Sequence, residues 1–506
     1  MEKRFILAFT LSLLVLMLWS AYVSKGRRLE TNGPTIKDET TLPVLSERPS
    51  SLAVNEQPAA SLPTFKHSQD SLELAFIEPL AAIQSITFKA YQDYKFSLGS
   101  GFEMSNLVSN FINASISPAG ALFTYKDHNK EIKKEFIFSK SSNELWLKIN
   151  VQSEVSKPIN VQFAIILGRL DISHKNINAR YQNTTIATQD KVQHFNLQKN
   201  VQSANIKFLS FNDRYFSAII EPAASNYSGY IKRINSSEAE IGIITPEVTL
   251  LPGQTSEHKF HIYLGPQDLK LINRINPAWA AIINYGTFDF ISQILLQLLD
   301  FLHNLLRNWG LAIILLSLLV YLALYPLTLK QMRSMKEMQV LQPHIEELRK
   351  SYKDNPQRLN KEILELYRQH KVNPFGGCLP LLLQMPIFFA LYQALSRSVV
   401  LKGAKFLWIK DLSEPDRLFT LPTTLPILGN ELNILPIIMA IGMFFQQKMS
   451  TVNAASTTAE QQKLMLIIMP AMFGIIFYHM PSGLVLYWFV NSALMLFYQL
   501  KISRLK

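Results

Sequence analysis

Two long apolar runs, separated by a densely charged stretch, constrain the fold of this chain more than any other feature of its sequence. The first run extends from Leu311 to Leu329 and the second from Cys378 to Leu395. A helix of about 20 residues, rising about 1.5 Å per residue, covers the hydrocarbon core of a bilayer. The pattern therefore predicts two spanning helices that hold a charged hairpin on one side of a membrane.

Composition adds a second region to this picture. Hydrophobic residues make up 48% of the 506 residues, but they are concentrated at the N-terminus and beyond Ala280. This indicates a soluble region joined to a membrane region. The net charge of +12 suits either nucleic acid or an anionic membrane surface. The apolar runs favour the membrane, and no basic arm or aromatic RNA motif supports a specific nucleic-acid partner. The single cysteine, Cys378, excludes an internal disulfide and a multi-cysteine metal site.

The N-terminus carries its own apolar run, Phe5 to Val23, directly after Lys3 and Arg4. Such a run is a signal peptide or a signal anchor. It is longer than a usual signal peptide core and lacks a clean cleavage site, which favours an uncleaved anchor over residues 1–24. The positive-inside rule places Lys3 and Arg4 in the cytoplasm. Residues 25–70 are rich in Pro, Ser, Thr and Glu, which is typical of a disordered tether.

Residues 71–276 have the pattern of β structure. Short runs that alternate or are wholly apolar are separated by Asn, Gly, Ser and Pro, and many strands without intervening helices favour a β-sandwich. His258 and His261 resemble a metal-ligand pair, but a spacing of three places them on opposite faces of a strand. We interpret both as ordinary strand residues, and nothing in this domain indicates catalysis.

An amphipathic helix is predicted within residues 277–308. The polar residues there recur at helical spacing and so do the apolar ones, which gives the helix one polar and one apolar face. Such a helix lies in the membrane interface or packs on the soluble domain. The second span, residues 309–329, follows. Ser317, Tyr321, Tyr325 and Thr328 fall within about 80° on one face of this helix. This polar face either packs against other helices or lines a hydrated groove.

The charged stretch, residues 330–372, predicts a two-helix hairpin with a turn at Lys353 to Pro356. Its excess of Lys and Arg over Asp and Glu in a short loop is typical of the cytoplasmic side. The charged face of the hairpin is either simply solvated or a docking surface for lipid, the ribosome or a protein partner.

Four further segments complete the predicted membrane region. Pro380 and Pro386 should bend the third span. Cys378 is interpreted as a packing residue. A stripe of Met465, Met469 and Met472 either fills the core or offers a soft surface to varied clients. The expected segments are a third span (373–397), an outer loop (398–433), the fourth to sixth spans (434–500) and a cytoplasmic tail (501–506).

Six spans result, with both termini in the cytoplasm. No Asp, Glu, Lys, Arg or His lies deep in any of them, which argues against a proton- or sodium-coupled transporter. No catalytic, nucleotide-binding or metal-binding motif is present either. We therefore expect no enzymatic activity, no cofactor and no metal.

Six short motifs, taken together, resemble the YidC/Oxa/Alb family of membrane-protein insertases from about Tyr285 to Gln499. They are NWG at Asn308, YPLT at Tyr325, LQP at Leu341, NPFGGC at Asn373, QMPIF at Gln384 and PSGLVLYW at Pro481. The resemblance implies a polytopic α-helical membrane protein with six spans, five of them a core that the family shares, and a large extracytoplasmic β-sandwich domain. That large domain is similar to the Gram-negative type, which places it in the periplasm.

The resemblance also implies a function. Family members insert and fold integral membrane proteins in the cell inner membrane, alone or with the Sec translocon, through a hydrophilic groove open to cytoplasm and lipid. The implied partners are nascent membrane proteins, the Sec translocon, the ribosome and membrane lipids. A transporter or channel, or a structural assembly scaffold, remains the alternative.

Eight residues form the expected substrate groove. The family usually has an arginine where this chain has Tyr321, and commonly two tyrosines where this chain has Tyr487 and Trp488. We therefore expect a groove that works by hydration rather than by a fixed charge. The eight residues are Ser317, Tyr321, Tyr325, Gln384, Phe388, Tyr487, Trp488 and Asn491.

Overall fold

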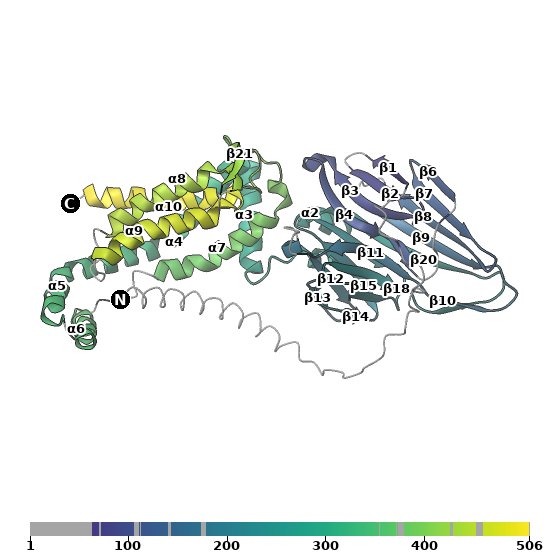
Figure 1. Ribbon diagram of the computed structural model, residues 1–506, viewed down its shortest axis with the longest axis horizontal. Coiled ribbons are helices and arrows are strands. Elements are labelled where there is room, and N and C mark those ends of the chain that lie inside the picture. Colours follow the sequence, from purple (N-terminus) through teal and green to yellow (C-terminus); the bar gives the residue numbers. More distant parts are fainter. Residues whose placement is uncertain are drawn as a thin grey trace. The chain divides into compact units, whose positions relative to one another are not determined.

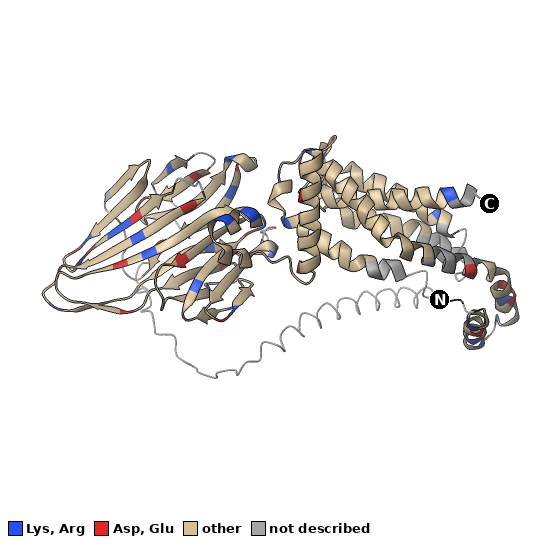
Figure 2. Ribbon diagram, turned by 180° about the vertical axis from the view of Figure 1, so that it is seen from behind, with Lys and Arg blue, Asp and Glu red and all other residues tan. Residues whose placement is uncertain are grey.

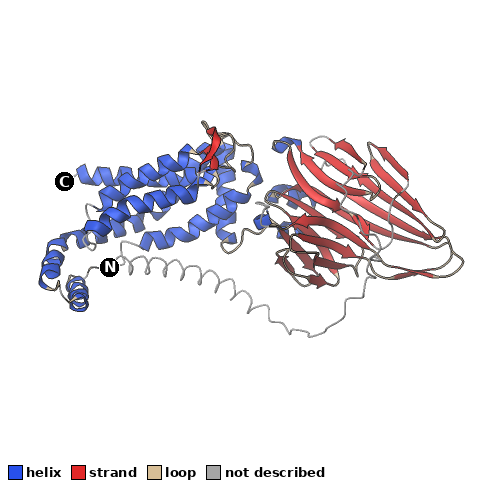
Figure 3. Ribbon diagram, in the orientation of Figure 1, coloured by secondary structure: helices blue, strands red, loops and turns tan. Residues whose placement is uncertain are grey.

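The computed structural model comprises a β-rich domain followed by a helical region (Figures 1 and 3). The predicted N-terminal anchor, most of the tether and Cys378 lie outside the described residues. The structure describes residues 63–504 except 70–71, 106–110, 112, 140–142, 174–178, 354, 371, 373–378, 426–428 and 452–458.

The largest sheet of the β domain is antiparallel and has nine strands in the order β13-β12-β15-β16-β20-β9-β8-β7-β6. Strand β9 shows why these segments are strands: Leu145, Leu147, Ile149 and Val151 are buried and alternate with partly exposed residues, the period that a half-buried strand requires. The strands are β6 (Asn113–Ser117), β7 (Gly120–Lys126), β8 (Lys130–Phe138), β9 (Glu144–Ser153), β12 (Asn183–Thr188), β13 (Val192–Phe195), β15 (Ile206–Asn212), β16 (Phe216–Pro222) and β20 (Thr255–Pro266).

Smaller sheets complete the β domain and share one hydrophobic core with the large sheet. Phe136 of β8, Ile165 of β11 and Phe96 of β4 all belong to this core and are almost fully buried. The prediction of a β-rich domain is therefore confirmed. The remaining strands are β1 (Thr64–Gln69), β2 (Leu72–Ile77), β3 (Ala82–Phe88), β4 (Tyr94–Gly101), β5 (Glu103–Ser105), β10 (Ile159–Val161), β11 (Ala164–Asp171), β14 (Val201–Ser203), β17 (Ser228–Arg233), β18 (Glu238–Ile244) and β19 (Val248–Leu250).

The first strand begins earlier than the sequence predicted. Residues 64–69 were assigned to the tether, yet they form β1 and pair with β2 in antiparallel register. The Phe65 ring stacks on Phe76 with centroids 5.0 Å apart. One aromatic residue in a polar stretch is too weak a signal to predict a strand, because the partner strand provides most of its stabilisation.

Three elements connect the β domain to the long helices. Asp268 caps helix α2 (Leu269–Ile275) by accepting hydrogen bonds from two backbone N–H groups. The 3-10 helix η3 (Pro277–Ile282) and helix α3 (Asp289–Leu306) follow. One face of α3 is buried in the core of the helical region, whereas Phe290, Phe301 and Leu305 are exposed. The helix therefore packs on the helical region, and its exposed apolar face suits the membrane interface.

Among the described residues of the helical region, two helices are long and apolar enough to cross a membrane, over Trp309–Leu329 and Ser482–Lys501. Two further apolar stretches, Ile434–Met449 and Leu466–Tyr478, are shorter, so the count of six spans stays a prediction. The helices are α4 (Trp309–Val340), α7 (Leu379–Arg397), α8 (Ile434–Thr451), α9 (Ala459–Tyr478) and α10 (Ser482–Arg504).

Helix α4 continues past its apolar stretch and leads into a pair of short helices, α5 (Gln342–Ser351) and α6 (Pro356–Gln369). Asn355 accepts a hydrogen bond from the Arg358 N–H and so caps α6, with Pro356 in its first turn. Leu341, Ile345 and Tyr367 form a small core between the two helices. Figure 2 shows that the charged residues gather in α5, α6 and the β domain, whereas the long helices carry few.

The loop after α7 has more structure than the sequence indicated. It begins with a 3-10 turn, η5 (Val399–Leu401), and ends in a β-hairpin of β21 (Phe419–Leu425) and β22 (Gly429–Leu432). Asp416 accepts hydrogen bonds from the backbone N–H groups of Ile434 and Leu435, each at 2.9 Å. This loop therefore fixes the start of α8.

A candidate substrate site among the membrane helices

A hydrogen-bonded group joins α7 to α10. Gln384 Nε2 of α7 donates to the Tyr487 hydroxyl of α10 at 2.9 Å. Asn491 Nδ2, one turn further along α10, donates to the Tyr487 carbonyl oxygen at 3.0 Å. Tyr487 is fully buried, whereas Gln384 and Asn491 are partly exposed. The structure thus brings together three of the eight predicted residues from segments about a hundred positions apart.

An aromatic cluster lies beside this group. The Phe388 ring of α7 meets the Trp488 ring of α10 edge-on, with centroids 5.2 Å apart. Phe477 of α9 lies 5.7 Å from Phe388 and 5.4 Å from Trp488, and Phe473 stacks on Trp488 at 5.9 Å. Phe388 and Trp488 were predicted site residues, but Phe473 and Phe477 were not. Their spacing of four on α9 is the sequence signal that could have indicated a shared aromatic face.

Ser317 of α4 is fully buried and its hydroxyl donates to the Ile313 carbonyl oxygen at 2.8 Å. Thr328 bonds the Leu324 carbonyl oxygen in the same way at 3.1 Å. Both hydroxyls satisfy themselves within their own helix, which is a common arrangement for Ser and Thr in membrane helices. For these two residues the structure therefore agrees with the packing interpretation.

Tyr321 differs from its neighbours on α4. Its phenol oxygen is buried, yet it has no hydrogen-bond partner among the described residues. The ring lies 6.3 Å from Tyr325, whose own ring meets Tyr498 of α10 edge-on at 5.6 Å. A buried hydroxyl without a partner is costly unless water or another polar group reaches it. This oxygen is therefore the polar side-chain atom of α4 whose hydrogen bond the described residues do not supply.

One polar contact of the region was not predicted at all. Ser292 of α3 is fully buried, and its hydroxyl donates to the Ala390 carbonyl oxygen of α7 at 3.0 Å. The sequence places Ser292 on the polar side of α3, and only tertiary packing shows that this side faces α7. The contact fixes the amphipathic helix to the helix that carries Gln384 and Phe388.

The chemistry of these side chains is that of a polar surface without charge. We name Ser317, Tyr321, Tyr325, Gln384, Tyr487 and Asn491 the membrane polar cluster. It has a part on α4, which meets α10 through the rings of Tyr325 and Tyr498, and a part on α7 and α10, which the hydrogen bond from Gln384 to Tyr487 holds together. Its hydroxyls and amides can donate or accept hydrogen bonds, but none is a nucleophile with an activating base beside it. Among the described residues, no group of His, Cys, Asp and Glu could hold a metal ion. The arrangement suits transient binding of polar groups rather than a chemical reaction.

A β-rich domain followed by helices long and apolar enough for a bilayer, with an uncharged polar cluster among them, defines an integral membrane protein with a large domain outside the membrane. Comparisons with known proteins agree. Residues 301–506 match the family model described as 60Kd inner membrane protein. Residues 121–298 match the model described as YidC periplasmic domain.

Curated relatives give the same result. The chain is 30% identical to the membrane protein insertase YidC of Pelobacter propionicus over 552 aligned residues, covering 100% of this chain and 99% of the relative. It is 34% identical to the insertase YidC of Syntrophobacter fumaroxidans, covering 74% and 68%. A crystal structure titled an active YidC insertase covers 86% of this chain and 92% of that one, at 21% identity and a TM-score of 0.42.

The chain therefore belongs to the YidC family of membrane protein insertases, and the resemblance found in the sequence is confirmed. Its relatives are inner membrane proteins with a periplasmic domain. Their names describe insertases and not catalysts of a chemical reaction, in agreement with the expectation that the chain is not an enzyme.

Proposed function

We propose that this protein inserts and folds integral membrane proteins in the inner membrane, and that the membrane polar cluster receives the polar part of each client. The client's apolar segment then moves into lipid beside the aromatic cluster of Phe388 and Trp488. Burying about 20 apolar residues provides the driving force, so no chemical energy is needed. The topology that goes with this proposal has six spans and both termini in the cytoplasm.

The observation that carries the proposal is the buried hydroxyl of Tyr321, which has no hydrogen-bond partner in the part of the chain that the structure describes. A charged residue costs about 2.5 to 3.5 kcal/mol at the centre of a membrane helix, and water held at a half-crossing polar site lowers that cost. Tyr321 stands where the family usually has an arginine. The phenol keeps a polar atom there without fixing a positive charge, so selection for acidic clients should be weak.

Four partners belong to the same proposal: nascent membrane proteins, the Sec translocon, the ribosome and membrane lipids. Nascent membrane proteins are the clients, and the Sec translocon is an alternative route for the same clients. The hairpin of α5 and α6 carries the charges that suit a ribosome or lipid headgroups; its exposed residues include Glu346, Glu347 and Arg358. The exposed charges there have both signs with an excess of Lys and Arg, so they suit an anionic surface, either ribosomal RNA or lipid headgroups.

The experiment is insertion of a purified single-span client into liposomes that contain the protein, measured by protection of the translocated tail from protease. Tyr321→Leu and Tyr321→Phe should both reduce insertion several-fold, because each removes the hydroxyl. Tyr321→Arg should retain it, because the arginine also binds water. Leu322→Ala, at the neighbouring exposed position, is the matched control and should insert clients like the wild type.

Equal insertion by the wild type and Tyr321→Leu would refute the role of the hydroxyl. Crosslinking from Tyr321 and Phe388 to nascent chains separates an insertase from a passive scaffold, because a scaffold would give no crosslink. Flux of a small solute through the same liposomes would instead indicate a transporter or channel.

A further inference from the structure

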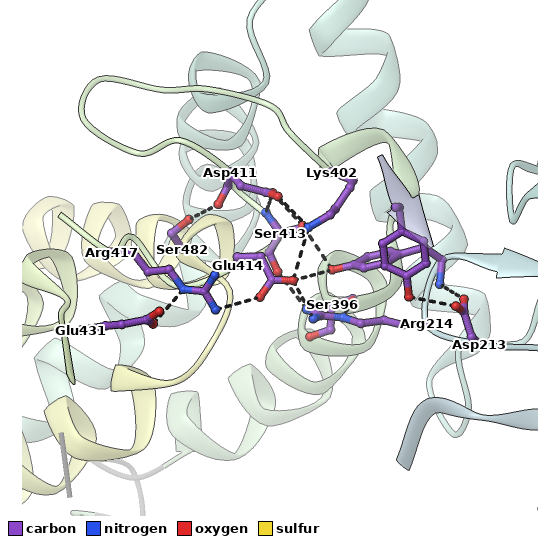
Figure 4. Close-up of polar contacts among 12 residues, drawn as sticks. Asp213, Arg214, Ser396, Lys402, Asp411, Ser413, Glu414, Arg417, Glu431 and Ser482 are labelled. Carbon is purple, nitrogen blue, oxygen red and sulfur yellow. Dashed lines mark hydrogen bonds and ion pairs between the residues drawn. The ribbon is translucent and has the colours of Figure 1, made fainter. Parts of the chain in front are cut away.

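A polar joint connects the β domain to the loop after α7, at a distance in sequence of about 200 residues. Its centre is Arg214, in the turn between β15 and β16 (Figure 4). Arg214 Nε donates to the Ser396 carbonyl oxygen at 2.7 Å, and Nη2 donates to the Ser413 carbonyl oxygen at 2.8 Å. Nη1 pairs with Glu414 Oε1 at 3.0 Å. The guanidinium therefore binds the end of α7 and the following loop at once.

The turn that carries Arg214 is held rigidly from the β-domain side. The Asp213 carboxylate accepts hydrogen bonds from the N–H groups of Tyr215 and Phe216, each at 2.7 Å, and from the Tyr94 hydroxyl at 2.8 Å. The Tyr215 hydroxyl reaches Ser413 Oγ at 3.2 Å. Since the backbone of the turn is fixed by Asp213, Arg214 does not have to be ordered again when it binds the loop.

On the loop side of the joint, the charged side chains also pair with one another. Lys402 Nζ pairs with Asp411 at 2.9 Å and with Glu414 at 3.6 Å. Ser413 Oγ donates to Asp411 Oδ1 at 2.7 Å. Arg214 and Lys402 thus face Asp411 and Glu414, two positive charges against two negative ones. We name these four residues, with Tyr215 and Ser413, the joint.

The same loop holds the first turns of two membrane helices. At the start of α10, the Ser482 N–H donates to the Glu414 carbonyl oxygen at 2.8 Å, and the Gly483 N–H donates to the Leu412 carbonyl oxygen at 2.9 Å. Ser482 Oγ also donates to the Asp411 carbonyl oxygen at 3.1 Å. Asp416 caps α8, as described above. The loop is therefore bonded to the ends of α7, α8 and α10 on the side of the β domain.

We propose that Arg214 is a positioning residue that locks the 402–417 loop against the β domain and so keeps these ends of α7, α8 and α10 closed. In this arrangement the buried guanidinium, with the Tyr215 hydroxyl beside it, connects the β domain to the loop that holds the membrane helices. The proposal stands independently of the role of Tyr321, because it concerns closure at the β-domain end of the helices and not the binding of clients.

The test uses the full-length protein in lipid nanodiscs and hydrogen–deuterium exchange of its backbone amides. Arg214→Gln should raise exchange at least tenfold in residues 399–417 and at the first turns of α8 and α10, because the guanidinium gives up two bonds to the loop and one to the end of α7. Glu414→Gln should raise exchange in the same segments from the other side of the joint. Arg233→Gln, an exposed arginine of the same domain, is the matched control and should change none of them.

A second measurement reports closure directly. Leu435 is buried at the start of α8, and Leu435→Cys in a Cys378→Ser background can be labelled by an impermeant maleimide added from the β-domain side. Arg214→Gln should speed labelling several-fold. Unchanged loop exchange and unchanged labelling in Arg214→Gln would overturn the proposal. So would increased exchange that is as large in β8 and β9 as in the loop, because it would show a loss of β-domain stability instead.

Discussion

The joint and the membrane polar cluster are both polar groups of side chains inside this protein, but they are built in opposite ways. The joint contains four charged residues, and Arg214 directs all three of its nitrogen positions at acceptors. The membrane polar cluster contains no charge, and the Tyr321 hydroxyl in it has no partner among the described residues. A polar network in which every group has a hydrogen-bond partner rigidifies its surroundings, whereas a buried polar group without a partner can bind a ligand or water.

This difference indicates that the two groups of side chains have different roles: the joint fixes a geometry, and the membrane polar cluster offers hydrogen bonds. Charge is used where the protein must hold one geometry, outside the membrane span, where desolvation can be offset by several close partners. Hydroxyls and amides are used among the membrane helices, where a permanent charge is expensive and where, in the function proposed above, clients must both bind and leave. The predictions below test whether the two sites respond as differently as their construction implies.

The largest expected effect comes from breaking the joint. Glu414→Leu removes the carboxylate that pairs with the buried Arg214 and the partly exposed Lys402, and removing one partner of a buried ion pair costs about 3–5 kcal/mol. Gln384→Leu removes one neutral hydrogen bond and should cost about 1 kcal/mol. Thermal unfolding of both variants in one detergent gives the comparison. Similar losses of unfolding temperature would contradict the distinction between the two sites.

The second prediction concerns pH and Asp213. Burial raises the pKa of this carboxyl to about 6 from 3.8, although three hydrogen bonds and Arg214 favour the charged form. The native state therefore binds the proton more tightly, and the free energy of unfolding falls as pH rises from about 4 to about 6. At 1.36 kcal/mol per unit the whole effect is about 3 kcal/mol, with about 1 kcal/mol of it between pH 5 and 7.

Asp213→Asn separates this effect from all other titrations. The variant cannot lose a proton at this position, so its stability relative to the wild type should increase by about 1 kcal/mol from pH 5 to pH 7. Unfolding by urea at a series of pH values measures both proteins. Parallel curves for the two proteins would show that Asp213 does not titrate in this window.

The sequence patterns correctly predicted the features that depend on one segment alone. The apolar length of α4, the turn before α6 with Asn355 and Pro356, and the alternation of β9 each follow from a period or a cap within one segment. The helical phase also placed Ser317, Tyr321 and Tyr325 on one face of α4. These features need no knowledge of a partner segment.

Contacts between distant segments were not predictable in this way. Gln384 and Tyr487 were both candidate residues, but nothing local shows that they bond each other. Arg214 was missed entirely, because a charged residue in a β-turn is ordinarily solvated. Strand β1 was missed because its stabilisation comes from pairing with β2, which its own sequence does not show. The family resemblance helped with the membrane helices and contributed nothing to the joint.

A smaller effect is expected where α7 and α10, two of the three helices that carry the membrane polar cluster, meet. Tyr487→Phe removes the acceptor of the Gln384 amide and should cost about 1 kcal/mol, because the fully buried Tyr487 ring is otherwise unchanged. Phe497→Leu, at an exposed position of the same helix, is the control and should change stability less. The apparent unfolding temperature in detergent measures both. A loss as large as that of Glu414→Leu would show that α7 and α10 depend on this bond as the β domain depends on the joint.

The smallest effect is expected at Ser317, and it sharpens the comparison within the membrane polar cluster itself. The Ser317 hydroxyl is bonded to Ile313 of its own helix, so Ser317→Ala exchanges an internal bond for a good helix former and should change stability by less than about 0.5 kcal/mol. Client insertion should also stay near the wild-type level, unlike in Tyr321→Phe, although each variant loses one hydroxyl from the same face of α4. Ser317→Ala could instead impair insertion as strongly as Tyr321→Phe. Client binding would then not depend on whether a hydroxyl lacks a partner among the described residues. All hydroxyls on this face of α4 would contribute to insertion.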